Sequence, residues 1–182
     1  MSRVARAVET EPQTAVVLRP ACDDDFEALA ALRADKDAQH LLLAHPESVN
    51  GNVQDWLQRR RSDPDGYFAV VTPACGVSAV GFVQLVGIHR LDRYAFAGIA
   101  LLDSARGQGF GRAAMLELMR IARDERGLRK LLLYVRSDNL PALQLYHAIG
   151  YRTVGVMREQ YDDGARLHDV MLLEILLATA AQ

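Results

Sequence analysis

The chain has 182 residues, 50% of them hydrophobic and 24% charged, which is the balance of a soluble globular domain with a substantial core. Its formal net charge of −2 argues against a basic surface for nucleic acid. No apolar run reaches the roughly 18 residues of a membrane-spanning helix. We therefore expect neither a nucleic-acid partner nor a membrane partner.

The two cysteines, Cys22 and Cys75, have no companions at the spacing of a metal site. We expect no metal, and we interpret both thiols as buried or incidental in a reducing cytoplasm. The first residues, MSRVARAVETEPQ, lack the apolar core of a signal peptide, so we expect a cytoplasmic protein. Residues 1–14 are predicted to form a flexible tail, and residues 15–182 a single domain.

The first third of the chain predicts a strand and two helices. TAVVLRP (residues 14–20) is typical of a strand that ends at its proline. DDDFEALAALRADKD (23–37) has an acidic start and apolar residues at helical spacing. VQDWLQRRR (53–61) predicts a second helix, and HLLLAHPESVNGN (40–52) between the helices has the composition of an irregular loop.

The rest of the chain alternates strands and helices. GYFAVVT, AVGFVQLVGIH and YAFAGIALL predict three antiparallel strands, followed by a helix from Gly109 that stops at Gly127. KLLLYV resembles a central strand covered on both faces, and NLPALQLYHAIG a helix with an Asn cap. YRTVGVMREQY and LHDVMLLEILL form a last hairpin around DDGA. The order predicts an α+β fold, with a mixed sheet of about seven strands flanked by about four helices.

The segment ARGQGFGRAAM joins the third of these antiparallel strands to a helix through Gly107, Gly109 and Gly111. A glycine-rich turn at a helix N-terminus leaves backbone N–H groups pointing outward, which suits an anion such as phosphate. Without a Cβ at Gly109 or Gly111, phosphate oxygens can approach the amides closely. Arg106 and Arg112 add positive charge, so we interpret the segment as a phosphate-binding turn.

Two common phosphate motifs are excluded. A P-loop needs Lys followed by Ser or Thr after the glycines, which is missing here. A dinucleotide-binding turn needs different glycine spacing and a parallel βαβ unit. The remaining alternative is a glycine turn used only for tight strand-to-helix packing.

Two motifs carry a family resemblance. Arg106-x-x-Gly109-x-Gly111 resembles the Gln/Arg-x-x-Gly-x-Gly/Ala signature of the GNAT superfamily of acyl-CoA-dependent N-acetyltransferases. NLPALQLYHAIGY resembles the Asn-x-x-Ala-x-x-Leu-Tyr-x-x-x-Gly-Phe/Tyr stretch of the same superfamily, with matches at Asn139, Ala142, Leu145, Tyr146, Gly150 and Tyr151. The element order fits over roughly residues 15–177. Residues 154–173 resemble the ends of diamine, amino-sugar and ribosomal-protein N-acetyltransferases.

The resemblance implies acetyl-CoA as acyl donor. In the superfamily, the pyrophosphate lies on the glycine turn, and the pantetheine arm pairs with the fourth strand where it splays from the fifth. The side-chain amide of the residue matched by Asn139 often bonds the pantetheine. The cofactor-binding residues that follow are Ala100, Leu101, Leu102, Arg106, Gly107, Gln108, Gly109, Phe110, Gly111, Arg112 and Asn139.

Tyr146 is the catalytic residue that the resemblance implies. It lies seven positions after Asn139, which puts both on nearly the same helix face. A phenol with an ordinary pKa near 10 is protonated at pH 7 and can donate its proton to a departing thiolate. The alternative is a half-buried tyrosine that packs on the sheet.

The general base is left open. Many superfamily members carry a Glu on the fourth strand, but YAFAGIALL contains no acid. Candidates near strand ends are His89, Glu159, His168 and Asp169. Two groups of aspartates have alternative interpretations: Asp23 to Asp25, and the pair Asp162 and Asp163. They form either an acidic lip for a cationic amine or, preferably, a helix N-terminus and a turn tip, respectively.

The function expected from these features is acetyl transfer from acetyl-CoA to a primary amine of a small molecule, a polyamine or an amino sugar. One alternative is acetylation of a protein N-terminus. That reaction needs an open groove rather than a closed pocket, and the loop from His40 to Asn52 decides which of the two is present. Another is a non-catalytic acyl-CoA-binding module. A homodimer is left open.

Overall fold

The computed structural model describes residues 15–44 and 52–177, so the predicted tail of residues 1–14 lies outside the described residues. The strands are β1 (Val16–Arg19), β2 (Tyr67–Pro73), β3 (Gly81–His89), β4 (Tyr94–Leu101), β5 (Lys130–Arg136), β6 (Arg152–Asp162) and β7 (Leu167–Leu176). The α-helices are α1 (Phe26–Ala34), α2 (Lys36–Leu41), α4 (Val53–Ser62), α5 (Phe110–Arg120) and α6 (Leu140–Ala148). Short 3₁₀ turns cover Asp23–Asp25 and Asp103–Ala105, and a π-helical turn, Ile121–Glu125, extends α5.

All seven strands form one mixed sheet in the order β1-β2-β3-β4-β5-β7-β6. The pairs are antiparallel except for β4 and β5, which run parallel. The last strand, β7, inserts between β5 and β6, and the turn of the β6–β7 hairpin has Gly164 at φ 87. The predicted α+β fold with a seven-stranded mixed sheet is confirmed.

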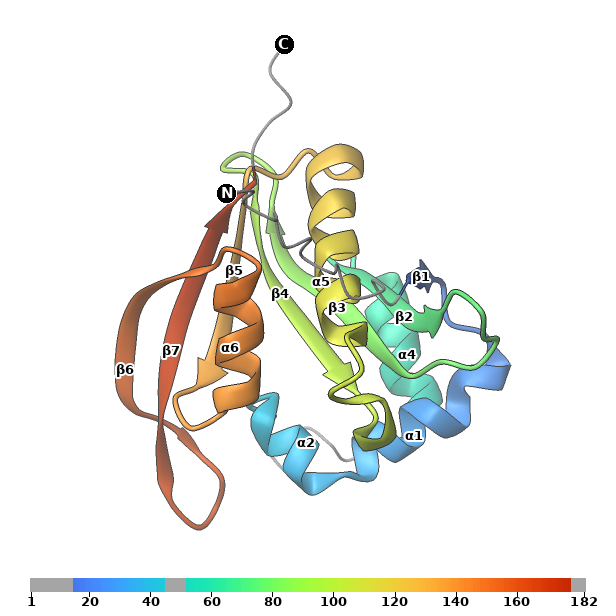
Figure 1. Ribbon diagram of the computed structural model, residues 1–182, viewed down its shortest axis with the longest axis horizontal. Helices are drawn as coiled ribbons and strands as arrows, with labels where there is room; N and C mark the ends of the chain where they lie inside the picture. Colours follow the sequence, from blue (N-terminus) through green and yellow to red (C-terminus); the bar gives the residue numbers. More distant parts are fainter. Residues whose placement is uncertain (1–14, 45–51, 178–182) are drawn as a thin grey trace, which may run out of the picture.

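Helices cover both faces of the sheet (Figure 1). On one face, α5 and α6 pack on alternate strand residues such as Val71, Val83 and Leu133. On the other face, α1 and α4 bury the residues between them, such as Val70 and Phe82. This two-residue alternation is what a sheet buried on both sides requires.

The helix predicted over residues 23–37 is divided in the structure. Asp35 has extended backbone (φ −73, ψ 100), and its carboxylate accepts a hydrogen bond of 3.0 Å from the N–H of Ala38. An aspartate side chain that satisfies such an orphan N–H starts a new helix rather than continuing the old one. The described residues therefore contain five α-helices instead of about four.

The sheet is interrupted between β4 and β5. The two strands pair only at Tyr94–Lys130, Ala95–Leu131 and Phe96–Leu132, although both continue further. Tyr134 of β5 is 46% exposed, which corrects the prediction of a strand covered on both faces. The gap opens toward the carboxyl ends of both strands (Figure 1).

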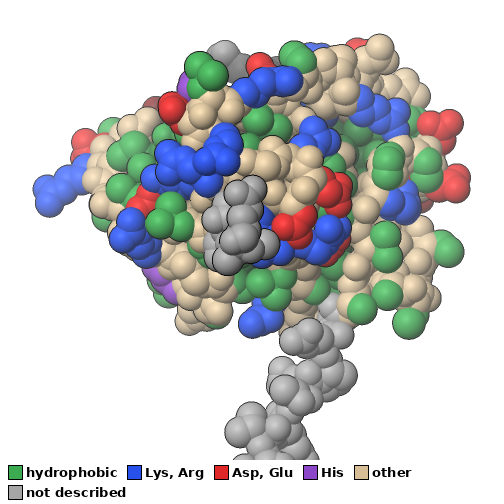
Figure 2. Space-filling view, turned by 90° about the horizontal axis from the view of Figure 1, so that it is seen from above, with side chains coloured by type: hydrophobic (Ala, Val, Ile, Leu, Met, Phe, Trp, Pro, Cys, Tyr) green, Lys and Arg blue, Asp and Glu red, His purple; other side chains and the backbone are tan. Residues whose placement is uncertain are grey.

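Surface charges are mixed rather than segregated. The end seen in Figure 2, which is the top of Figure 1, shows Lys and Arg side chains interspersed with Asp and Glu side chains. Many basic side chains pair with carboxylates, as Arg120 does with Glu117 at 2.7 Å and Arg152 with Glu174 at 2.6 Å. No helix in the described ranges is long and apolar enough to cross a membrane.

Candidate active site

A cleft of about 630 Å³ occupies the gap between β4 and β5. Its walls come from β4, from the glycine turn before α5, and from residues of α2 and α6. One wall is backbone. Leu102 donates its N–H to the Val80 carbonyl at 2.9 Å, so the alternate residues Ala100 and Gly98 also face β3. Ile99 and Leu101 therefore turn their N–H and C=O groups toward the gap.

This parity corrects part of the predicted cofactor contact. Of the three residues expected to pair with an extended ligand through backbone groups, only Leu101 faces the cleft with those groups. Ala100 and Leu102 use them toward β3, while Ile99, which sequence reasoning missed, faces the cleft. The alternation depends on which residue of β4 opposes which residue of β3, and a local sequence pattern does not contain that register.

The glycine turn has the backbone conformation that glycine permits. Gly107 has φ 72 and Gly109 has φ 84, and Gly109 is the N-cap of α5. Gly111 has a packing role beside the one predicted. A Cβ built at Gly111 would lie 3.3 Å from Leu145 and 3.5 Å from Leu101, so its small size serves packing between α5, α6 and β4 as well.

Two arginines flank this turn. The Nε of Arg106 donates to the Leu101 carbonyl at 3.3 Å, and its guanidinium pairs with Asp103 at 3.3 Å. Arg106 thus contacts one of the backbone groups that face the cleft. Arg112 is exposed and lines the cleft from the first turn of α5.

The structure brings most of the predicted site residues to this one cleft. Those that line it are Ala100, Leu101, Arg106, Gly107, Gly109, Gly111, Arg112, Asn139 and Tyr146. Leu102, Gln108 and Phe110 do not line it. The side chain of Gln108 turns back and donates to the Ser104 carbonyl at 2.6 Å.

Asn139 and Tyr146 enter the cleft from α6. The Oδ1 of Asn139 accepts a hydrogen bond of 3.3 Å from the N–H of Ala142, which confirms the predicted helix cap and leaves the side-chain NH₂ group outside that bond. Tyr146 is 7% exposed, and burial raises the pKa of its hydroxyl to about 12. Its ring lies 5.8 Å from that of Tyr151, whose hydroxyl is buried without a hydrogen-bond partner in the described structure.

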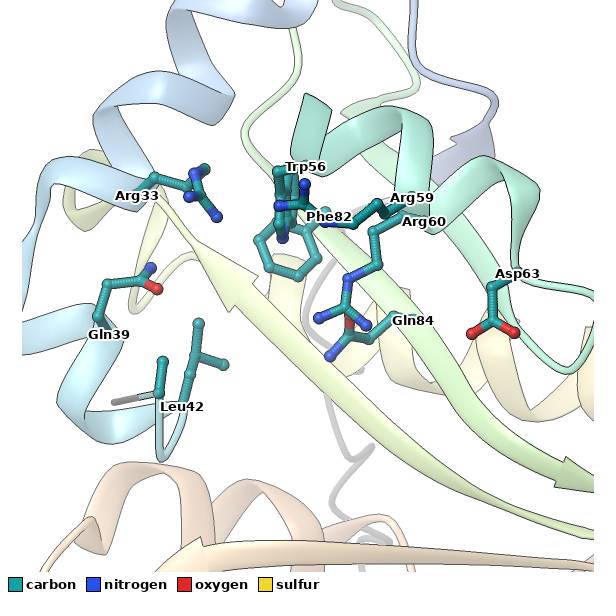
Figure 3. A pocket seen from close by; sticks show the side chains of 10 residues that line it. Arg33, Gln39, Leu42, Trp56, Arg59, Arg60, Asp63, Phe82 and Gln84 are labelled. Carbon is teal, nitrogen blue, oxygen red and sulfur yellow. The ribbon is translucent and has the colours of Figure 1, made fainter. Parts of the chain in front are cut away.

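A second pocket, of about 400 Å³, opens over Phe82 and Gln84 of β3 (Figure 3). We call it the arginine pocket, and its lining is Arg33, Gln39, Leu42, Ala44, Trp56, Arg59, Arg60, Asp63, Phe82 and Gln84. Gln84 and Leu42 also line the cleft, so the two spaces adjoin. The side chain of Gln84 crosses over Gly98 of β4, where a Cβ would lie 3.1 Å from its Nε2.

The arginine pocket was missed by sequence reasoning. Arg33 comes from α1, Arg59 and Arg60 come from α4, and Gln84 comes from β3 (Figure 3). A signal existed in the sequence, since Gln84 is a polar residue inside an otherwise apolar strand. The tertiary contact of two helices with that strand, which makes the arginines converge, is not a local pattern.

The four candidates for a general base lie away from the cleft. His89 pairs with Asp92 at the β3–β4 turn, and His168 is held by Asp163 at 2.5 Å. Asp169 accepts a hydrogen bond of 2.8 Å from the backbone N–H of Glu159. No carboxylate or imidazole lines the cleft within the described part of the chain.

The aspartates proposed as an acidic lip have structural partners instead. Asp25 is 1% exposed and accepts two hydrogen bonds from Arg19, of 2.7 and 2.8 Å. Asp162 and Asp163 accept backbone N–H groups inside the β6–β7 turn. Neither group lines the cleft or the arginine pocket, so the interpretation as a helix start and a turn fits the structure.

Three further expectations concern the cysteines, a metal site and the loop after α2. Cys22 and Cys75 are free and exposed, so neither is a buried thiol. No cluster of three or more His, Cys, Asp or Glu side chains that could hold a metal occurs among residues 15–44 and 52–177. The loop from His40 to Asn52 includes residues 45–51, which lie outside the described residues, so its openness is not described.

Comparisons with known proteins agree with the fold. A spermidine N-acetyltransferase from Vibrio cholerae, crystallised with CoA and spermine, superposes with a TM-score of 0.81 at 23% identity over 89% of this chain and 95% of that one. Mycothiol acetyltransferases from Salinispora tropica and Nocardiopsis dassonvillei are each 32% identical, over 73% and 79% of this chain. The chain spans only 42% and 45% of their length. The family described as "Acetyltransferase (GNAT) domain" matches residues 15–152, and the chain therefore belongs to the GNAT acetyltransferase family.

Proposed function

We propose that this chain transfers an acetyl group from acetyl-CoA to the primary amine of a small molecule. The observation that carries the proposal is the gap between β4 and β5, where backbone groups of Ile99 and Leu101 that pair with neither neighbouring strand lead to a glycine turn at the N-terminus of α5. An extended arm with amide groups fits the first part, and a pyrophosphate fits the second. Acetyl-CoA, which supplies an acetyl thioester, has both parts.

Different residues of the cleft would bind the two parts of acetyl-CoA. The backbone of Ile99 and Leu101 would pair with the amide-bearing arm, and the NH₂ group of Asn139 would reach it from α6. The turn from Arg106 to Arg112 would hold the pyrophosphate with backbone N–H groups and two guanidinium groups.

Tyr146 would act as the general acid. Its hydroxyl keeps its proton throughout the neutral range because burial raises its pKa to about 12. A protonated phenol on the cleft wall can donate that proton to the sulfur as the carbon–sulfur bond breaks. The proton that the amine loses leaves by water, since the described lining of the cleft offers no carboxylate or imidazole.

The charge around the arginine pocket bears on the acceptor. A spermidine N-acetyltransferase is among the structural neighbours, and a polyamine was one of two acceptor classes expected from the sequence. A polyamine is a multiple cation, and three arginines with one aspartate form a poor environment for it. Of the two classes, an amino sugar is the acceptor that we propose.

The test is a thiol-release assay with purified chain, acetyl-CoA and a panel of primary amines that includes spermidine and glucosamine. We expect release that depends on the amine, together with cofactor binding by calorimetry. Tight binding without release for every amine would favour a non-catalytic acyl-CoA-binding module. Absence of cofactor binding would overturn the proposal itself.

A further inference from the structure

The arginine pocket concentrates positive charge beside the cleft. Its described lining contains three guanidinium groups and a single carboxylate, that of Asp63. The carboxylate is partly occupied, because its Oδ1 accepts a hydrogen bond of 3.0 Å from the N–H of Asp65. Neither Arg59 nor Arg60 forms an ion pair in the described ranges, in contrast to Arg120 or Arg152 on the surface.

The three arginines also lie close enough to repel one another. Burial, followed by the charges of Arg59 and Arg60, lowers the pKa of Arg33. Burial and Arg59 likewise lower the pKa of Arg60, against the attraction of Asp63. Arg33 is 7% exposed, with its guanidinium 5.1 Å from the centre of the Trp56 ring. Like charges gathered in a partly buried pocket are unfavourable unless an anion offsets them.

The boundary between the pocket and the cleft contains a buried hydrogen-bond acceptor, the side-chain oxygen of Gln84. The side-chain oxygen of Gln84 is buried and has no hydrogen-bond partner among the described residues. A buried acceptor oxygen without a donor is unfavourable, and an N–H group of a ligand would offset that cost. Gln84 lines both the arginine pocket and the cleft, so a ligand N–H group that bonds to its oxygen lies beside the gap between β4 and β5.

We infer that the arginine pocket binds the anionic group, a carboxylate or a phosphate, of an acceptor whose amine meets Gln84 at the border of the cleft. Guanidinium groups recognise both anions through paired N–H donors, and the planar groups of Arg59 and Arg60 extend into the pocket from α4 (Figure 3). This inference rests on the proposed acetyl transfer and narrows its substrate to an amine, an amino sugar included, that carries an anion.

Matched amine pairs test the inference. Alanine and alaninamide differ by a carboxylate, and O-phosphoethanolamine and ethanolamine differ by a phosphate. We expect kcat/KM to favour the anionic member of at least one pair by about tenfold or more, and the pair that does so identifies the anion. Equal kcat/KM within both pairs would overturn the inference while leaving acetyl transfer intact.

Arginine variants link the preference to the pocket. Arg60→Gln and, separately, Arg59→Gln should lower the ratio of kcat/KM for the preferred pair by about 10- to 100-fold, the range of a lost charged hydrogen bond. Arg59 is exposed, so its variant keeps the test valid if Arg60→Gln does not fold. Arg123→Gln, at an exposed arginine paired with Asp124, removes one charge elsewhere and should leave the ratio unchanged. An unchanged ratio in both pocket variants would overturn the inference.

Gln84→Met separates the two parts of the proposed contact. It removes the acceptor oxygen but no charge, so it should lower kcat/KM similarly for both members of a pair. A selective loss for the anionic member would contradict the assignment of Gln84 to the amine. If no amine is acetylated at all, the proposed function fails. Calorimetric binding of O-phosphoethanolamine to the wild type, weakened in Arg60→Gln, then supports the pocket separately, and absence of binding overturns it.

Discussion

The cleft and the arginine pocket adjoin at Gln84 and Leu42, but they are built from different parts of the chain. The cleft relies on backbone: two strand residues whose backbone groups face the gap, and a turn with two glycines at positive φ. The pocket relies on side chains that two helices and one strand bring together. Backbone groups are present whatever the side chains are, so a site built from backbone, like the cleft, tolerates sequence change. A site built from side chains, like the arginine pocket, is altered by one substitution.

This difference has a functional consequence within a family. A cofactor common to all members suits a backbone-built site, and an acceptor that differs between members suits a side-chain-built one. A structural neighbour named for spermidine and relatives named for mycothiol can therefore share the fold with this chain without sharing the acceptor. Three predictions examine how far the division holds.

The largest effect is expected at Tyr146, the side chain of the cleft that we propose as the general acid. Tyr146→Phe keeps the ring and its packing but removes the donor, so kcat should fall by about 10²- to 10⁴-fold with the acetyl-CoA dissociation constant nearly unchanged. Steady-state kinetics and calorimetry measure the two quantities.

Tyr151→Phe is the matched control for this variant. Tyr151 is also buried, its ring centre lies 5.8 Å from that of Tyr146, and it does not line the cleft. Loss of its unpartnered hydroxyl should leave kcat near the wild-type value. A Tyr146→Phe variant with wild-type kcat would assign Tyr146 to packing.

The dependence on pH is expected to come from the acceptor rather than from the cleft. With an alkylamine of ordinary pKa near 10.4, kcat/KM should rise about 100-fold between pH 7 and pH 9, as the neutral amine increases tenfold per unit. A general acid is lost when its pKa is passed, and burial raises the pKa of Tyr146 to about 12, so no decline should appear below pH 10. A falling limb between pH 8 and pH 9.5 would contradict the role of Tyr146.

The smallest of the three effects is expected in the glycine turn, on binding alone. Gly109→Val places a branched side chain at φ 84, between the amides and a phosphate, and should raise the acetyl-CoA dissociation constant at least tenfold, about 1.4 kcal/mol. Gly164→Val introduces the same strain at φ 87 in the β6–β7 turn, away from the cleft. Thermal unfolding should show similar losses for both variants. Equal acetyl-CoA affinities of the Gly109→Val and Gly164→Val variants would contradict the assignment of the turn to phosphate.

Much of the fold was predictable because its signals are local. The Asn139 cap, the glycine turn and the hairpin at Gly164 each depend on a few neighbouring residues. The division of the first helix at Asp35 was missed, because an aspartate inside a helical pattern and an aspartate that caps a new helix are the same in sequence. The order of the last strands, with β7 between β5 and β6, depends on long-range pairing.

The candidate site was predictable to the same extent. Its glycine turn was predicted from the glycine spacing, and the α6 motif from the resemblance to the GNAT superfamily, because the residues of each motif are close in the chain. The orientation of Ile99 was not found, because it depends on register with β3. The arginine pocket was not found, because Arg33, Arg60 and Gln84 belong to three elements and only packing brings them together.

The short pairing of β4 with β5 also affects how the protein behaves among other proteins. Where the pairing stops, two strands in the middle of the sheet become edge strands, and exposed edge strands invite β-pairing between chains and hence aggregation. Here the open edge is internal, since residues of α2 and α6 line the same gap. A slender ligand can enter where the strand of a second molecule has little room. The fold therefore leaves two strand edges open to a ligand and shields them from β-pairing with other chains.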